Sequence, residues 1–131
     1  MTARVLMVDD EPDAVLLFQQ HFRREIRQGA YVFEFADSGE AALACLESYG
    51  APRVMLILSD INMPGMSGLD LLSEVKARWP ELVVFMITAY GDADTERRAR
   101  ERGADAFINK PVDFTALQEA MRAAVAHGDD G

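Results

Sequence analysis

Two acidic positions in the sequence follow apolar segments and need an explanation. Asp9 and Asp10 come directly after RVLMV at residues 4–8, and Asp60 comes just after VMLIL at residues 54–58. A charged side chain at the edge of a hydrophobic core is costly to desolvate unless another group pairs with it. We therefore expect these carboxylates to have a cationic partner, a chemical role, or both.

The three carboxylates could share a metal ion if the fold brings them together. Two like charges about 4 Å apart repel by roughly 4 kcal/mol at an effective dielectric constant of 20, so a positive group must lie among them. The candidates are Lys110 and a hard divalent cation. A set of oxygen ligands without histidine or cysteine favours Mg²⁺, or Mn²⁺, over zinc.

Two further side chains complete a candidate site for phosphoryl transfer. Thr88 and Lys110 also follow apolar runs, LVVFMI and AFI respectively. A carboxylate beside Mg²⁺, with a hydroxyl and an ammonium across the pocket, can position a transferring phosphoryl group and neutralise its oxygens. Asp60 is the favoured nucleophile, since it stands alone after its strand while Asp9 and Asp10 form an adjacent pair for the metal.

Short apolar runs of strand length alternate with helical patterns along the chain. Three of the runs are nearly uniform in hydrophobicity, as in strands that are covered on both faces. The expected strands cover residues 4–8, 31–35, 54–58, 82–87 and 106–108.

Apolar residues recur at helical spacing between these strands. Three such stripes are Val15, Phe18, Phe22 and Ile26; Leu69, Leu72, Val75 and Trp79; and Phe114, Leu117, Met121 and Val125. Start and stop signals agree with them. The signals are Pro12 with Asp13 at the first helix, Asp37 or Ser38 before the second, Pro80 after the third and Gly103 after the fourth.

Strands that alternate with helices predict an α/β fold with a doubly wound parallel sheet, right-handed crossovers and helices on both faces. Ligands bind such sheets beyond the carboxyl ends of the strands. Asp9, Asp10, Asp60, Thr88 and Lys110 all follow expected strands. We therefore expect them to converge at one edge of the sheet.

Four motifs together resemble the receiver domain of bacterial two-component response regulators. They are VDDEPD at residues 8–13, SDINMPGMSGLDLL at 59–72, ITA at 87–89 and FINKP at 107–111. The resemblance covers about residues 4–126, with the motifs in the family's order on the expected elements. It implies a flavodoxin-like sheet of five strands in the order 2-1-3-4-5.

Carried over residue by residue, the resemblance implies that Asp60 is the phosphoacceptor. Asp10 would bind Mg²⁺ directly, and Asp9 would assist largely through water. Asn62 would contribute its backbone carbonyl to the metal.

The resemblance also implies roles on the last two strands. Thr88 would hydrogen-bond a phosphoryl oxygen and Lys110 would pair with the phosphoryl group. Phe107 matches the aromatic switch residue that turns inward when Thr88 moves. The peptide bond between Lys110 and Pro111 would be cis, and Tyr90 and Asn62 occupy positions that tune the lifetime of the phosphoryl group.

Each of these residues also has a simpler interpretation. Asp9 and Asp10 could cap the first helix, as acidic residues near helix N-termini often do. Lys110 could be a surface lysine and Thr88 an ordinary threonine at the end of a strand. Phe107 could be a core aromatic.

The segment DADTERRARERGA at residues 92–104 has helical character but almost no apolar stripe. Little burial would hold it, so it should be among the less stable elements and could act as a bistable element beside the site. Its charges are either a solvated face with intrahelical ion pairs or a partner or dimer surface on the fourth helix, fifth strand and fifth helix, as the family uses. The arginines are Arg97, Arg98, Arg100 and Arg102, and they are interleaved with Asp94, Glu96 and Glu101.

The composition predicts a single globular domain. The 131 residues are 50% hydrophobic and 27% charged, and the net charge of −9 argues against direct binding to nucleic acid. No run has the length of a membrane span and no signal peptide is recognisable, which predicts a cytoplasmic location. Cys45 is expected to pack in a helix. We expect one domain over 1–131, with a core at about 4–126 and a frayed tail or the start of a linker at 127–131.

These observations predict a phosphorylation-activated receiver in a two-component phosphorelay. Asp60 would accept a phosphoryl group from a sensor histidine kinase or a histidine phosphotransfer protein, and a homodimer or a fused effector domain could receive the signal. The domain would catalyse only its own phosphotransfer and autodephosphorylation, so we do not expect an enzyme. Two alternatives are a phosphorylation-independent adaptor and, with less support, a Mg²⁺-dependent phosphohydrolase, which would need an acid/base carboxylate where Asn62 stands.

Overall fold

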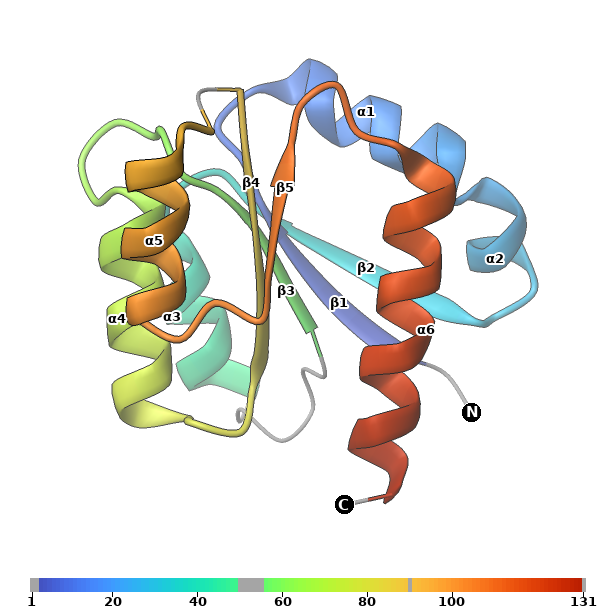
Figure 1. Cartoon of the computed structure of the whole chain (residues 1–131). Helices are drawn as coiled ribbons and strands as arrows, with labels where there is room; N and C mark the ends of the chain where they lie inside the picture. The colour runs from blue at the N-terminus through green and yellow to red at the C-terminus, as the bar shows by residue number, and fades with distance from the viewer. Residues whose placement is uncertain (1–2, 50–55, 90, 131) are drawn as a thin grey trace.

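The computed structural model describes residues 3–49, 56–89 and 91–130 and has a parallel sheet between two layers of helices (Figure 1). The strands are β1 (Ala3–Val8), β2 (Tyr31–Ala36), β3 (Leu56–Asp60), β4 (Val83–Thr88) and β5 (Ala106–Asn109). The helices are α1 (Pro12–His21), α2 (Arg23–Arg27), α3 (Gly39–Tyr49), α4 (Gly68–Arg78), α5 (Ala93–Glu101) and α6 (Phe114–Asp130).

The described strands form one sheet in the order β2-β1-β3-β4-β5, and all of its pairs are parallel. This confirms the predicted α/β class and the order 2-1-3-4-5. Val54 and Met55, which the sequence assigned to the third strand, lie outside the described residues, as does Tyr90.

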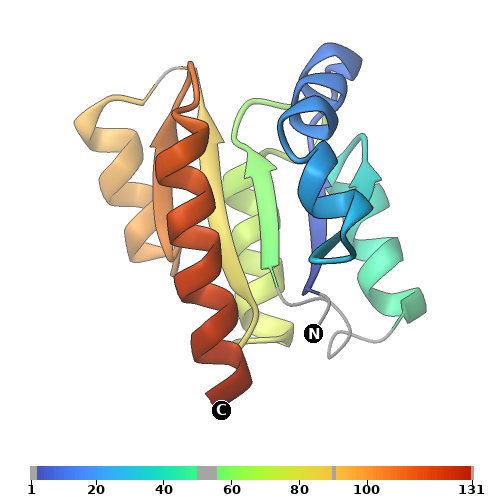
Figure 2. The same cartoon turned by 90° about the vertical axis from the view of Figure 1, so that its right-hand side faces the viewer.

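The sheet buries both of its faces, which explains why the strand sequences are so uniformly apolar. Along β1, Leu6 and Val8 pack on the face covered by α3, α4 and α5, which we call the α4 face. Val5 and Met7 pack on the opposite face, beneath α1, α2 and α6, which we call the α6 face. Figure 2 shows α1, α2 and α6 in front of the sheet, with the other helices behind it.

The first predicted helix is divided into α1 and α2 at Phe22, which has φ −103° and ψ 13°. The break is local, since the Phe22 N–H still donates to the carbonyl oxygen of Phe18 at 3.0 Å. The Phe22 side chain is only 1% exposed and its ring packs against Tyr31, Phe33 and Phe114. We attribute the break to this packing, which overrides the helical pattern of the sequence.

The predicted helix boundaries agree with the structure. Pro12 is the first residue of α1, and the Ser38 Oγ accepts the Ala41 N–H at the start of α3 at 3.0 Å. Gly103 follows α5 with φ +103°, in the left-handed region. The final helix, α6, reaches Asp130 and so includes most of the segment for which the sequence predicted a frayed tail or a linker. In the described part of the chain, no helix combines the length and apolar character needed to cross a membrane.

Gly68 allows α4 to begin directly against the end of β3. A Cβ atom at this position would lie 2.0 Å from the backbone oxygen of Asp60, and the Gly68 N–H donates to the Ile61 oxygen at 2.7 Å. The Ser67 Oγ caps the helix by accepting the Asp70 N–H at 3.1 Å. The start of α4 therefore fixes the backbone that follows Asp60.

Little burial holds α5, and its charged side chains form exposed ion pairs. Throughout α5, Ala99 is the only buried residue. Its intrahelical ion pairs join Arg97 with Asp94, and Arg100 with Glu96. Just after α5, the Arg102 Nη1 lies 3.5 Å from Asp70 Oδ1 and 3.3 Å from Ser73 Oγ, on α4. The expected solvated face is present, and a partner surface on this helix stays a prediction.

We expect the backbone amides of α5 to exchange with deuterium roughly tenfold or more faster than those of α4, because so little apolar surface must be exposed to open α5. Hydrogen exchange followed by mass spectrometry would measure both helices in one sample. The buried stripe of α4, Leu69, Leu72 and Val75, makes that helix the internal control. Equal protection of the two helices would contradict the expectation.

Replacing Gly68 with alanine should destabilise the fold by about 1–3 kcal/mol or more, because the new methyl group would overlap backbone atoms that cannot move aside cheaply. Urea unfolding of the Gly68→Ala variant and the wild type would measure the difference. An unchanged midpoint would show that α4 can shift away from Asp60 without cost.

Candidate functional site

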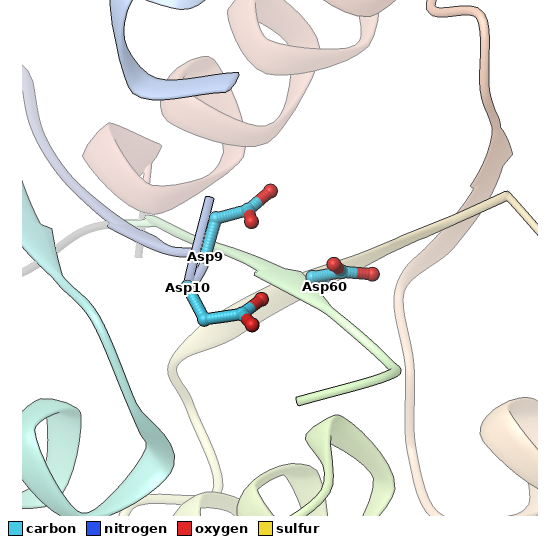
Figure 3. Close-up of side chains that lie close together, drawn as sticks. All are labelled: Asp9, Asp10 and Asp60. Carbon is cyan, nitrogen blue, oxygen red and sulfur yellow. The ribbon is translucent and has the colours of Figure 1, made fainter. Parts of the chain in front are cut away.

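The carboxylates of Asp9, Asp10 and Asp60 lie together at the carboxyl ends of β1 and β3 (Figure 3). Each offers an oxygen atom, and these atoms are all within 4.8 Å of one another. Asp9 is 4% exposed and Asp60 is 6% exposed, whereas Asp10 is exposed. The structure thus brings together the three carboxylates that the sequence singled out.

Strand register explains this placement. In the parallel pair of β1 and β3, Val8 lies opposite Ser59, so the next residue on each strand is an aspartate. The Asp9 N–H donates to the Ala36 oxygen at 3.1 Å, which keeps the backbone of Asp9 in line with β2. The neighbouring strands β1 and β3 therefore place Asp9 and Asp60 at the same edge of the sheet.

Lys110 is the positive group that these carboxylates require. Its Nζ lies 3.5 Å from Asp9 Oδ2 and 3.5 Å from Asp60 Oδ2, and its backbone N–H donates to the Thr88 oxygen at 2.9 Å. Burial acts to lower the pKa of Lys110, but the carboxylates of Asp9 and Asp60 outweigh it and raise the pKa. Lys110 is therefore a charged member of the site rather than a lysine on the open surface.

The surroundings of Asp60 disfavour its charged form, whereas those of Lys110 favour the charged form. Burial is the main cause that raises the pKa of its carboxyl group, and the neighbouring charge of Asp9 adds to it. Lys110 and backbone hydrogen bonds from Asn62 and Ile61 act in the other direction without cancelling the rise. The folded protein is thus less stable with Asp60 ionised than it would be if this carboxyl group were neutral. A bound cation would reduce this cost.

The capping interpretation of Asp9 does not match the geometry. The N-cap residue of α1 is Glu11, whose side chain makes no capping hydrogen bond. The Asp9 Oδ1 accepts the N–H of Glu11 itself at 2.9 Å, rather than an N–H from the first turn of the helix. Asp9 instead turns its second oxygen toward Lys110.

Thr88 and Phe107 lie on neighbouring strands near the carboxylates. Thr88 ends β4 and is 0% exposed, and Phe107 is half-buried against the core of the α4 face. Gly91 packs closely on β5, because a Cβ at this position would lie 2.9 Å from Phe107 Cε1 and 1.7 Å from Asn109 Oδ1. A residue three positions after Thr88 is therefore in close contact with the strand that carries Phe107.

The remaining predicted features are also at this edge. The peptide bond between Lys110 and Pro111 is cis, as the resemblance implied. Asn62 is exposed and lies between two buried residues, Ile61 and Met63. Cys45 is half-buried against the core, as expected, and lines a cleft of about 320 Å³ that also touches Asp9 and Asp10.

The donor set fits a hard divalent cation. All of the candidate ligand atoms are oxygens, and Mg²⁺ commonly takes one or two carboxylates and completes its shell with water and phosphate oxygens. The exposed Asp10 is suited to direct binding, whereas Asp9 is already engaged by Lys110 and by the Glu11 N–H. The division of roles between Asp10 and Asp9 stays a prediction.

Sequence reasoning missed two residues that shape the site. The position of Gly68 in the sequence was informative. Glycine is a poor helix former, so a glycine at the first position of a helix, directly after a serine cap, suggests that close packing leaves no room for a side chain there. Glu40, in the first turn of α3, accepts the Met66 N–H at 3.1 Å. A glutamate in the first turn of a helix is ordinary, so nothing in the sequence pointed to this contact.

Comparisons with known proteins agree with this geometry. The family model of the response regulator receiver domain matches residues 5–122. Response regulator protein FleR of Pseudomonas aeruginosa is 36% identical over 121 residues, which are 92% of this chain and 24% of that protein. Sporulation initiation phosphotransferase F of Bacillus subtilis is 30% identical over 122 residues, which are 93% of each chain.

Among solved structures, response regulator protein TrrA from Thermotoga maritima, in complex with Mg²⁺–BeF, is similar with a TM-score of 0.79 and 29% identity. The match covers 93% of this chain and 98% of that one. Several curated relatives are longer, and the chain spans 24%, 32% and 26% of the length of three of them. On the match over residues 5–122, this chain belongs to the response regulator receiver domain family of two-component signalling.

Proposed function

We propose that this receiver is switched by phosphorylation of Asp60 in a two-component phosphorelay. The observation that carries the proposal is the position of Lys110, whose Nζ lies 3.5 Å from the carboxylates of both Asp9 and Asp60. Such a site can stabilise added negative charge on Asp60 while Asp10 remains available to a cation. The phosphotransferase name of one relative and the Mg²⁺–BeF complex of another support the same chemistry.

The donor would be a phosphohistidine on a sensor histidine kinase or a histidine phosphotransfer protein. A carboxylate oxygen of Asp60 attacks phosphorus, the new O–P bond forms as the N–P bond breaks, and the imidazole leaves with the electron pair of that bond. Lys110 neutralises the phosphoryl oxygens from one side, and the Thr88 hydroxyl donates a hydrogen bond to one of them.

Asp9, Asp10, Asp60 and the backbone carbonyl of Asn62 would hold Mg²⁺, or Mn²⁺, at the carboxylate edge. When bound, the cation supplies positive charge to the phosphoryl oxygens. The chain's own contribution is to keep the carboxylates close together at the carboxyl ends of β1 and β3. This arrangement explains how the site tolerates three neighbouring acids.

The signal would then leave through the loop after Thr88. As Thr88 moves toward the phosphoryl group, the Gly91 contact carries the loop's movement to Phe107 and to the surface formed by α5, β5 and α6. That surface would control a partner, a second copy of the chain or a fused effector domain. The protein would act in the cytoplasm and would modify only itself, by phosphotransfer and autodephosphorylation.

The two alternatives have less structural support. A Mg²⁺-dependent phosphohydrolase needs a second acid/base carboxylate near the nucleophile, but the residue two positions after Asp60 is Asn62. A phosphorylation-independent adaptor would need Lys110 only to neutralise the two buried carboxylates. The modification experiment below tests the adaptor, and turnover of a generic phosphate ester would be the test of the phosphohydrolase.

Incubation with acetyl phosphate and Mg²⁺ should add one phosphoryl group to the wild-type protein. We expect no adduct on Asp60→Asn, and none on the wild type when EDTA removes the cation. Intact-mass spectrometry measures each case, and Glu81→Gln removes an exposed carboxylate between α4 and β4, outside the cleft that Asp9 and Asp10 line, as the control. An adduct that survives on Asp60→Asn would place the acceptor elsewhere, and no adduct on any variant would favour the adaptor.

The raised pKa of Asp60 predicts a pH-dependent gain in stability for Asp60→Asn. A carboxyl group whose pKa is higher in the folded state destabilises that state when ionised, so its penalty is absent below the unfolded pKa of about 3.9 and grows as the pH rises through the folded pKa. Without divalent cations, the variant should therefore be more stable than wild type at pH 7, with a difference that shrinks toward pH 4.

Urea unfolding at several pH values measures this difference in the free energy of unfolding. Glu81→Gln again controls for the loss of one negative charge, since its carboxylate is exposed and lies outside the cleft of Asp9 and Asp10. A gain for Asp60→Asn that is constant across the pH range would mean that the buried charge is not its cause.

A further inference from the structure

Glu40 contacts a loop that lies 26 residues further along the sequence. Its Oε1 accepts the N–H of Met66 at 3.1 Å, and Met66 belongs to the loop at residues 61–67 between β3 and α4. The same loop contains Asn62. We propose that Glu40 is a positioning residue, which holds this loop in place and thereby sets the Mg²⁺ affinity of the site; the inference rests on the metal site proposed above.

The inner half of the loop contacts the core through two side chains, and its backbone continues directly into the outer half. Ile61 and Met63, on either side of Asn62, are 5% and 8% exposed. The Gly68 N–H donates to the Ile61 oxygen at 2.7 Å and closes the neck of the loop. A backbone hydrogen bond from Asn62 to the Asp60 carboxylate places this half directly against the site.

The outer half of the loop has little burial to hold it. Pro64 and Gly65 are exposed, and Gly65 has φ +75°, a conformation that residues with side chains rarely adopt. The loop therefore turns sharply at Gly65, directly before the amide that Glu40 binds. A hydrogen bond to a charged acceptor is well suited to fix such a segment, because it is stronger than one between neutral groups.

The fit between α3 and the loop is close on both sides of this hydrogen bond. A Cβ on Gly39 would lie 2.8 Å from Met66 Sδ, and a Cβ on Gly65 would lie 3.3 Å from Glu40 Oε1. Gly39 and Gly65 thus both lack a side chain at positions where one would interfere with the contact between Glu40 and Met66. These distances indicate a built contact between two elements rather than a chance approach of a surface glutamate.

The contact matters for the metal because Mg²⁺ demands well-placed ligands. Asn62 would supply a backbone carbonyl, which can reach the cation only if the loop keeps its position. Hydrogen bonds that orient a metal's ligands commonly change its affinity. Loss of the Glu40 contact should therefore raise the Mg²⁺ dissociation constant by roughly three- to tenfold, in keeping with one lost hydrogen bond.

The test is a Mg²⁺ titration of the full chain followed by NMR of backbone amides, on wild type, Glu40→Ala and Glu40→Gln. Glutamine keeps an oxygen that can accept the Met66 N–H but removes the charge. We expect Glu40→Ala to shift the Met66 amide resonance and weaken Mg²⁺ binding. Glu40→Gln should lose less affinity than Glu40→Ala, because its neutral amide oxygen can still accept the Met66 N–H, although more weakly than the carboxylate.

Glu47→Ala is the matched control. Glu47 lies on the same helix, and its Oε1 accepts from Arg78 Nη1 of α4 at 2.9 Å. This variant also removes one carboxylate and one contact of α3, but the lost contact is with α4 rather than with the loop. Its Mg²⁺ affinity should equal that of wild type. In phosphorylation by acetyl phosphate, Glu40→Ala should need more Mg²⁺ to reach half of its maximal rate, while the rate at saturating Mg²⁺ stays close to that of wild type.

The outcomes separate this inference from the proposed function. An unchanged dissociation constant for Glu40→Ala, in a wild type that binds Mg²⁺, would overturn the positioning role alone. If Glu40→Gln lost as much affinity as Glu40→Ala, the effect would come from charge rather than from the hydrogen bond, which also overturns it. No Mg²⁺ binding by the wild type would instead overturn the metal site on which the inference rests.

Discussion

The repulsion between buried carboxylates at one edge of the sheet is the constraint on which the rest of the site depends. Asp9 and Asp60 are nearly enclosed by protein, and Asp10 stands beside them. Lys110 lies between the two buried acids, but burial still raises the pKa of Asp60. The folded chain therefore keeps excess negative charge at this point, which makes the site receptive to a cation and sensitive to any change in its charge.

Apolar packing of the sheet offsets the cost of placing these charges together. Both faces of the sheet are closed by helices, so the strands that deliver the acids are held by extensive apolar packing. Gly68 lets α4 begin against the backbone of Asp60, and Glu40 reaches the same loop from α3. Elements on the α4 face thus hold the loop that follows the acceptor, while Lys110, which precedes α6, lies against the acceptor itself.

The sequence was sufficient for the fold and for most of the site because both depend on simple patterns. Uniform apolar runs that end in Asp9, Asp60 and Thr88 could be placed at one edge from strand periodicity alone, and the family resemblance supplied the strand order. The break at Phe22 and the contact of Glu40 could not be predicted. Each depends on a partner distant in sequence, an aromatic cluster in the first case and the Met66 amide in the second.

The place of β5 in the sheet has a mechanical consequence. As one of the two edge strands of the described sheet, β5 pairs with β4 alone, through four residues, whereas β1 and β3 each pair on both sides. A displacement of β5 would therefore disturb one short ladder rather than two. Such a displacement would carry Phe107 with it and would also move the segment that leads to Lys110, whose ammonium group lies between the two buried acids.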